Sequence, residues 1–173
     1  GDEAFISCTA LQNVEIQEGL ISIESQAFTA STLEKIELPD TIEEIDVGAF
    51  RDCKRLKTVT IGANLTSIGG VAFDECDSLE SITMPSTVAI IGERAFNNCQ
   101  KLKSVTFVDS TGEKRNEGII KEKAFYGCKN LEEIAIPDGI TKIESWVFGS
   151  CEKLQNVIIP DSVTSIEKST FHW

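Results

Sequence analysis

The residues of this chain whose side chains could most readily take part in chemistry are six cysteines and one histidine. A cysteine thiol can act as a nucleophile, as a metal ligand or as half of a disulfide. The stretch KAFYGCKNLEEIAIP, residues 123–137, places Cys128 three residues after Phe125. The same arrangement returns further along the chain, where Cys151 follows Phe148. Any cysteine chemistry must therefore be weighed against a role in a structural repeat.

The repeat extends over the whole chain. Eight of the nine phenylalanines recur at steps of about 23 residues, with one longer step after Phe96: Phe5, Phe28, Phe50, Phe73, Phe96, Phe125, Phe148 and Phe171. Every cysteine lies three residues after one of them: Cys8, Cys53, Cys76, Cys99, Cys128 and Cys151. In the second repeat Ser31 takes the cysteine position. A period of this length predicts a solenoid, because a single coil cannot bury its apolar face alone.

Each repeat predicts the same local structure. Its V-x-I segment alternates apolar and polar residues, which is the period of a strand with one buried face. Proline follows that segment in four repeats and ends the strand, because it has no N–H for the ladder. The A-F-x-x-C segment has apolar residues three apart, which favours a short helical turn.

The segment CDSLESITMPSTVAIIGERAF, residues 76–96, resembles the BspA-like, treponemal-type leucine-rich repeat. The family pattern is C-x-x-L-x-x-V-x-I-P-x-x-V-x-x-I-G-x-x-A-F. We therefore expect a right-handed leucine-rich-repeat solenoid of about eight repeats, each of roughly 23 residues. Short parallel β-strands would form one face, and turns or short helical segments the other. Residues 1–173 would form a single domain within a longer repeat array.

For the cysteines, the interpretation favoured by the repeat is a column of reduced, buried thiols packed as small apolar side chains. Disulfides between adjacent coils are the second possibility, because stacked strands bring Cα atoms within disulfide range. Metal binding is the third, although no C-x-x-C pair occurs. The one histidine, His172, has no nucleophile in a known motif beside it. We expect no cofactor, no metal and no enzyme.

The formal net charge of −12 disfavours nucleic acid and anionic membranes, because a phosphate partner would be repelled over most of the surface. No stretch is long and apolar enough to span a membrane. The charge does not identify a partner, and a protein ligand is the expected one; the sequence does not indicate an oligomeric state.

Two rows of strand residues are candidates for contact with a partner. The first, here called the recognition strip, changes from acidic through threonine to apolar: Glu15, Glu37, Thr60, Thr83, Thr106, Ala135 and Ile158. Threonine is also simply a good exposed strand residue. The second, the charged row, alternates in sign at its centre, which supports strand register: Gln12, Glu34, Lys57, Glu80, Lys103, Glu132 and Gln155.

Residues 108–118 carry six extra residues with the polar, glycine-containing composition of an exposed loop. Lys114 and Arg115 in this inserted loop form a basic point on an acidic chain, and loops on rigid scaffolds often carry specificity. A tolerated insertion is the alternative interpretation. Asn64 begins an N-x-T sequon in a predicted turn, where it would be exposed.

The family resemblance implies a cell-surface or secreted adhesin that binds host or extracellular matrix proteins such as fibronectin or fibrinogen. The residues themselves support only a protein-interaction module. A carbohydrate-binding module would need exposed aromatic residues as a stacking platform, and Tyr126, Trp146 and Trp173 lie outside the strand segments. An intracellular scaffold is the other alternative.

Overall fold

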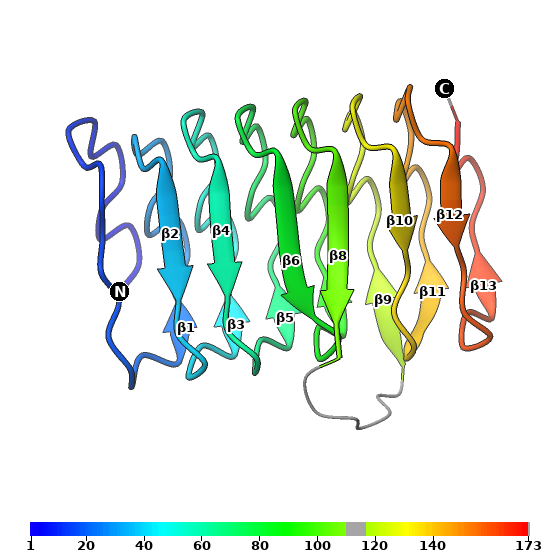
Figure 1. Ribbon diagram of the computed structural model, residues 1–173, viewed down its shortest axis with the longest axis horizontal. Helices are drawn as coiled ribbons and strands as arrows, with labels where there is room; N and C mark the ends of the chain where they lie inside the picture. The colour runs from blue at the N-terminus through cyan, green and yellow to red at the C-terminus, as the bar shows by residue number, and fades with distance from the viewer. Residues whose placement is uncertain (110–116, 173) are drawn as a thin grey trace.

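A computed structural model describes residues 1–109 and 117–172 of the chain. The described residues wind into an elongated parallel β-solenoid whose first and last coils lie at opposite ends (Figure 1). The six-stranded sheet contains the V-x-I segments: β2 (Lys35–Leu38), β4 (Thr58–Ile61), β6 (Ser81–Pro85), β8 (Ser104–Val108), β10 (Glu133–Ala135) and β12 (Asn156–Ile158). The seven-stranded sheet contains shorter strands: β1 (Ser22–Ile23), β3 (Glu44–Ile45), β5 (Ser67–Ile68), β7 (Ile90–Ile91), β9 (Gly118–Ile120), β11 (Ile140–Ile143) and β13 (Ser165–Ile166).

The repeat positions pair with themselves from coil to coil. Ile36 lies opposite Val59, Val59 opposite Ile82, and Ile82 opposite Val105, all in parallel register. The residues between them face outward, so the strands alternate buried and exposed side chains as the sequence predicted. Six of the seven V-x-I segments are therefore confirmed as strands with one buried face.

The phenylalanine column forms the centre of the core. Neighbouring rings stack with centroids 5.0 to 5.7 Å apart and planes within 13° of parallel. From Phe50 to Phe148 these rings are fully buried. Repeat leucines and isoleucines pack around them, among them Leu56, Leu79 and Ile91. One continuous apolar core thus runs the length of the solenoid.

The sequence did not predict the second sheet. The face opposite β2 to β12 was expected to hold turns or short helical segments, but the short segments that end in the repeat isoleucine form a parallel sheet of their own there. Strands of two residues are too short to show an alternating pattern. Glycine follows two of them, β5 and β7, where the coils approach closely: a Cβ on Gly92 would lie 2.5 Å from the Gly69 backbone.

The expected short helical segments are wrong, because the described residues contain no helix. In the A-F-x-x-C segment every second backbone N–H donates to a carbonyl of the next coil. Phe28 N donates to the Ala49 carbonyl at 2.8 Å, and Phe50 N to the Ala72 carbonyl at 2.8 Å. Residues such as Gln26 adopt positive φ, here 54°, which interrupts any helix. The segment is a series of turns bonded to the next coil.

The expected count of about eight repeats is also too high. The six-stranded sheet has one strand per turn, and the structure contains about six complete turns. Counting phenylalanines included the incomplete coils at both ends. The segment around Val14, for example, forms no strand, although it carries the repeat pattern.

Candidate interaction surface

The cysteine column is a structural device. Each buried thiol donates to the carbonyl of a phenylalanine from an earlier coil: Cys53 to Phe28, Cys76 to Phe50, Cys99 to Phe73 and Cys128 to Phe96, each at 3.1 Å, and Cys151 to Phe125 at 3.2 Å. The same carbonyl accepts an N–H from its own turn, as Phe28 does from Ser31 at 3.0 Å. The thiol therefore occupies a second acceptor position of a buried carbonyl.

Burial also lowers the reactivity of these thiols. Five of the six cysteines are fully buried, which confirms the predicted column, and Cys8 in the first coil is half-buried. Burial raises the pKa of Cys76, Cys99 and Cys128 well above the usual thiol value, and raises that of Cys151 to about 12. A thiol without thiolate character is a poor nucleophile. Cys128 is thus a packing residue.

The six-stranded sheet aligns the recognition strip along its outer face. Glu37 lies opposite Thr60, Thr60 opposite Thr83, and Thr83 opposite Thr106. Further along, Ala135 lies opposite Ile158. All these side chains are exposed, as is Glu15 in the first coil, which lies outside the paired strands. The predicted passage from acidic through threonine to apolar is present on one surface, and its partner-binding role stays a prediction.

The charged row lies beside the recognition strip, and its side chains form ion pairs between neighbouring coils. Glu34 accepts from Lys57 at 3.0 Å and from Arg55, and these two cations lower the pKa of its carboxyl. Lys103 and Glu80 form a second pair at 3.7 Å. The groups are largely exposed, so each pair contributes little stability. Opposite charges of the row thus pair between neighbouring coils, as the sequence predicted.

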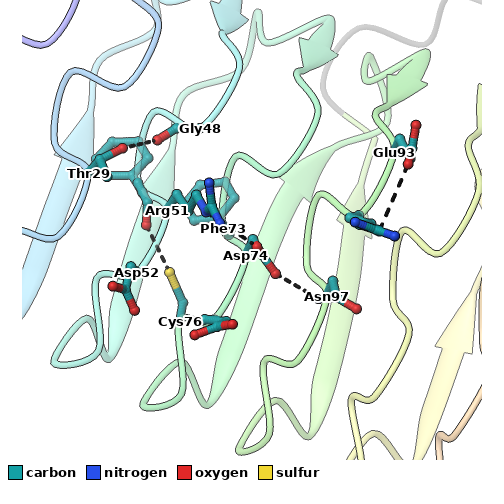
Figure 2. Close-up of polar contacts among 12 residues, drawn as sticks. Thr29, Gly48, Arg51, Asp52, Phe73, Asp74, Cys76, Glu93 and Asn97 are labelled. Carbon is teal, nitrogen blue, oxygen red and sulfur yellow. Dashed lines mark hydrogen bonds and ion pairs between the residues drawn. The ribbon is translucent and has the colours of Figure 1, made fainter.

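A buried carboxylate lies on the turn side of the solenoid. Asp74 is 6% exposed and accepts from Asn97 Nδ2 at 2.7 Å, while Arg51 Nε lies 3.5 Å from its other oxygen. Figure 2 shows Arg51 and Asn97 approaching Asp74 from the coils on either side. Burial raises the pKa of Asp74, although both neighbours favour the charged form. The cluster links three coils.

Aromatic side chains gather near the C-terminal end of the same side. The Tyr126 and Trp146 rings meet edge to face with centroids 6.4 Å apart, and Trp146 meets His172 at 4.9 Å. Gly149 lies beneath them, where a Cβ would come 2.8 Å from the Tyr126 ring. His172 is thus a ring contact of Trp146. Trp173 lies outside the described residues.

Other sequence features are placed as follows. Asn64 is exposed in a turn, as predicted. Lys114 and Arg115 lie outside the described residues, which resume at Glu117. Across residues 1–109 and 117–172, no group of three or more His, Cys, Asp or Glu side chains could hold a metal ion. The same residues contain no helix long and apolar enough to cross a membrane.

β8 and β10 pair over fewer residues than β6 and β8, and the sequence did not reveal this. β6 and β8 pair through five residues, whereas β8 and β10 pair only through Ser104–Glu133 and Val105–Ile134. Beyond that point Ile136 N donates at 2.9 Å to the Ile158 carbonyl in β12. The longer interval between Phe96 and Phe125 marks the place, but spacing does not show how the strands respond.

The geometry defines a parallel β-solenoid repeat protein with an exposed strand face. The family profile described as BspA type leucine rich repeat region matches residues 1–117 and 113–173, in six copies. The chain therefore belongs to the BspA-type leucine-rich-repeat family, and the six copies agree with about six turns.

Solved structures of bacterial leucine-rich-repeat proteins are similar. The T. pallidum leucine-rich-repeat protein is 25% identical with a TM-score of 0.69, over 87% of this chain and 69% of that one. A leucine-rich cell surface protein from Faecalibacterium prausnitzii A2-165 is 29% identical with a TM-score of 0.57, over 99% of this chain and 53% of that one. A Bacteroides ovatus leucine-rich-repeat protein, 22% identical with a TM-score of 0.53 over 99% of this chain and 55% of that one, shares the fold. No curated protein matches the chain.

Proposed function

We propose that this chain is the protein-binding part of a cell-surface or secreted adhesin, and that it contacts host or extracellular matrix proteins through the recognition strip. The observation that carries the proposal is the strip itself, which places exposed acidic, hydroxyl and apolar side chains in order along one sheet face. Repeat solenoids commonly use such extended surfaces for protein recognition. The cell-surface description of the F. prausnitzii relative supports the location.

The strip suits a protein partner better than a nucleic acid or a membrane. Its hydroxyl side chains, Thr60, Thr83 and Thr106, can donate and accept hydrogen bonds without a net charge. Its apolar end supplies Ile158, which is 66% exposed. A binding face with an apolar end and polar surroundings has the composition of a protein interface. Lys114 and Arg115 would add basic contacts from the inserted loop.

The test is binding to a panel of matrix proteins, including fibronectin and fibrinogen, by surface plasmon resonance. A Thr83→Arg, Thr106→Arg double variant should bind at least about tenfold more weakly, because two long charged side chains obstruct the strip. The matched control is Asn64→Arg, Gln100→Arg, which adds the same charge at exposed turn positions. Equal loss in both variants, or no saturable binding by the wild type, would refute the proposal.

A carbohydrate-binding role would use the aromatic cluster. Tyr126 and Trp146 lie together, but on the turn side and packed edge to face against each other. Sugar binding there should quench or shift Trp146 fluorescence and should survive the Thr83→Arg, Thr106→Arg changes. An intracellular scaffold would use the same strip, and the absence of a secretion signal in the parent reading frame would identify it.

A further inference from the structure

The six-stranded sheet is split between β8 and β10. β8 stays paired with β6 through Val108, which lies opposite Pro85, while β10 stays paired with β12 through Ala135 and Ile158. Between β8 and β10 the paired register ends at Val105 and Ile134. The pairing between β8 and β10 is therefore shorter than that between β6 and β8.

A hollow of about 250 Å³ lies at this split, lined by Ser104, Val105, Thr106, Phe107, Glu133, Ile134, Ala135, Asn156 and Ile158. Ala135 offers only a methyl group where the coils nearer the N-terminus carry threonine. Phe107 belongs to a buried repeat position but is only partly covered here. The side chain of Phe107 packs against the core on the inner face of the sheet, so the methyl group of Ala135 and the side chain of Ile158 supply the apolar surface of the hollow.

The hollow has one strongly exposed apolar side chain, that of Ile158, which is 66% exposed. On the coils nearer the N-terminus, the strip position of Ile158 carries Thr60 or Thr83. An exposed aliphatic side chain beside a concave surface is a feature of interaction sites.

The remaining rim is acidic. Glu133 lines the hollow, and Glu132 beside it is exposed. Lysines of neighbouring coils are directed elsewhere, Lys103 to Glu80 at 3.7 Å and Lys129 to Glu152 at 2.9 Å. Within residues 1–109 and 117–172, the Glu133 carboxylate has no ion-pair partner. A basic group on an incoming partner would therefore find a complementary charge.

We propose that this hollow is a socket for an extended protein segment that presents an aliphatic side chain next to a lysine or arginine. The aliphatic side chain packs against Ile158 over Ala135, and the basic group pairs with Glu133. The inference rests on the protein-binding function proposed above and names the site and the partner chemistry. A single buried anchor with charged neighbours carries much of the affinity of such contacts.

The test uses three acetylated, amidated pentapeptides with the sequences SKIKS, SKSKS and SEIES. Binding is followed by the amide chemical shifts of the ¹⁵N-labelled chain. SKIKS should shift the amides of Phe107, Ala135 and Ile158 saturably. The two other peptides should bind about tenfold more weakly or worse, because one lacks the anchor and the other reverses the charge. Equal binding of SKSKS, or shifts scattered over the surface, would overturn the proposal.

Two variants separate the socket from the rest of the sheet. Ala135→Lys fills the hollow and should abolish the SKIKS shifts, whereas Thr60→Lys, which places a lysine in the same row on β4, should leave them intact. Unchanged binding by Ala135→Lys would refute the site. Shifts that depend on the concentration of the chain alone, with a dimer in light scattering, would show that a second copy occupies the hollow and would also refute it.

The failure of the socket and the failure of the adhesin proposal are distinguishable. Matrix proteins that bind wild type and Ala135→Lys equally would leave the adhesin function standing and remove the socket. SKIKS binding that depends on Ala135, together with no matrix protein bound, would leave the socket standing and remove the proposed ligand class.

Discussion

Replacing Cys99 by aspartate tests whether the cysteine column is a buried part of the core. Cys99 is fully buried and donates to the Phe73 carbonyl. Burial already raises the pKa of its thiol. An aspartate in this position would be disfavoured as an anion, so its folded-state pKa would rise far above the unfolded value of about 3.9.

The size of the effect follows from that pKa difference. A group whose folded pKa is raised loses stability as the pH rises above its unfolded pKa, at about 1.4 kcal/mol per pH unit. If the introduced carboxyl stays protonated in the fold at pH 7, the titration costs about 4 kcal/mol. For a chain of this size that lowers the midpoint of thermal unfolding by roughly 8 to 16 °C.

The assay is thermal unfolding followed by circular dichroism between pH 4 and pH 7.5. Cys99→Asn is the matched control, because it has the same shape as the aspartate and does not titrate. Cys99→Ser should cost only about 1 kcal/mol, since a hydroxyl can still donate to Phe73 and serine stands at this position in the second repeat, as Ser31. Equal unfolding midpoints for Cys99→Asp and Cys99→Asn across the pH range would refute the reasoning.

Two further predictions follow. Native protein should react slowly with a thiol reagent, with Cys8 reacting first because it is half-buried, and denatured protein should titrate six thiols without reductant; fewer than six would show disulfides. Because burial raises the folded-state pKa of Asp74, its ionisation removes stability as the pH rises above about 3.9. Asp74→Asn should therefore unfold at a higher temperature than wild type at pH 7, with the gain fading towards pH 3.5, and a lower midpoint at pH 7 would contradict this.

The core was predictable because it repeats. The sequence of a single coil would not have identified Phe96 or Cys99 as buried. Because both residue types recur at fixed repeat positions, each phenylalanine is expected to pack on the phenylalanine of the neighbouring coil, and each cysteine beside the neighbouring cysteine. The recognition strip followed from the same argument, because strands in register bring Thr60, Thr83 and Thr106 into one row.

What the sequence missed has local physical causes. The A-F-x-x-C spacing suits a helix, but hydrogen bonds to the next coil and the positive φ of residues such as Gln26 produce turns instead. Strands of two residues, such as Ser22–Ile23, are too short to show an alternation of apolar and polar residues, so the sequence pattern did not predict the second sheet. The split between β8 and β10 depends on which neighbour each strand follows after the insertion, and the residues of one strand do not encode that choice.

The self-stacking of the core has a consequence for how this protein can change its length. Each phenylalanine ring of the column stacks on the phenylalanines of neighbouring coils, at 5.0 to 5.7 Å, so a duplicated coil would create a junction like those already present. Gene duplication or deletion of a whole coil therefore changes the reach of the molecule in steps of about 4.8 Å without redesigning the core. The phenylalanine stack also tolerates a coil of another length, because Phe96 and Phe125 are 29 residues apart in the sequence and their ring centroids are still 5.1 Å apart. The length of the solenoid can thus change by whole coils.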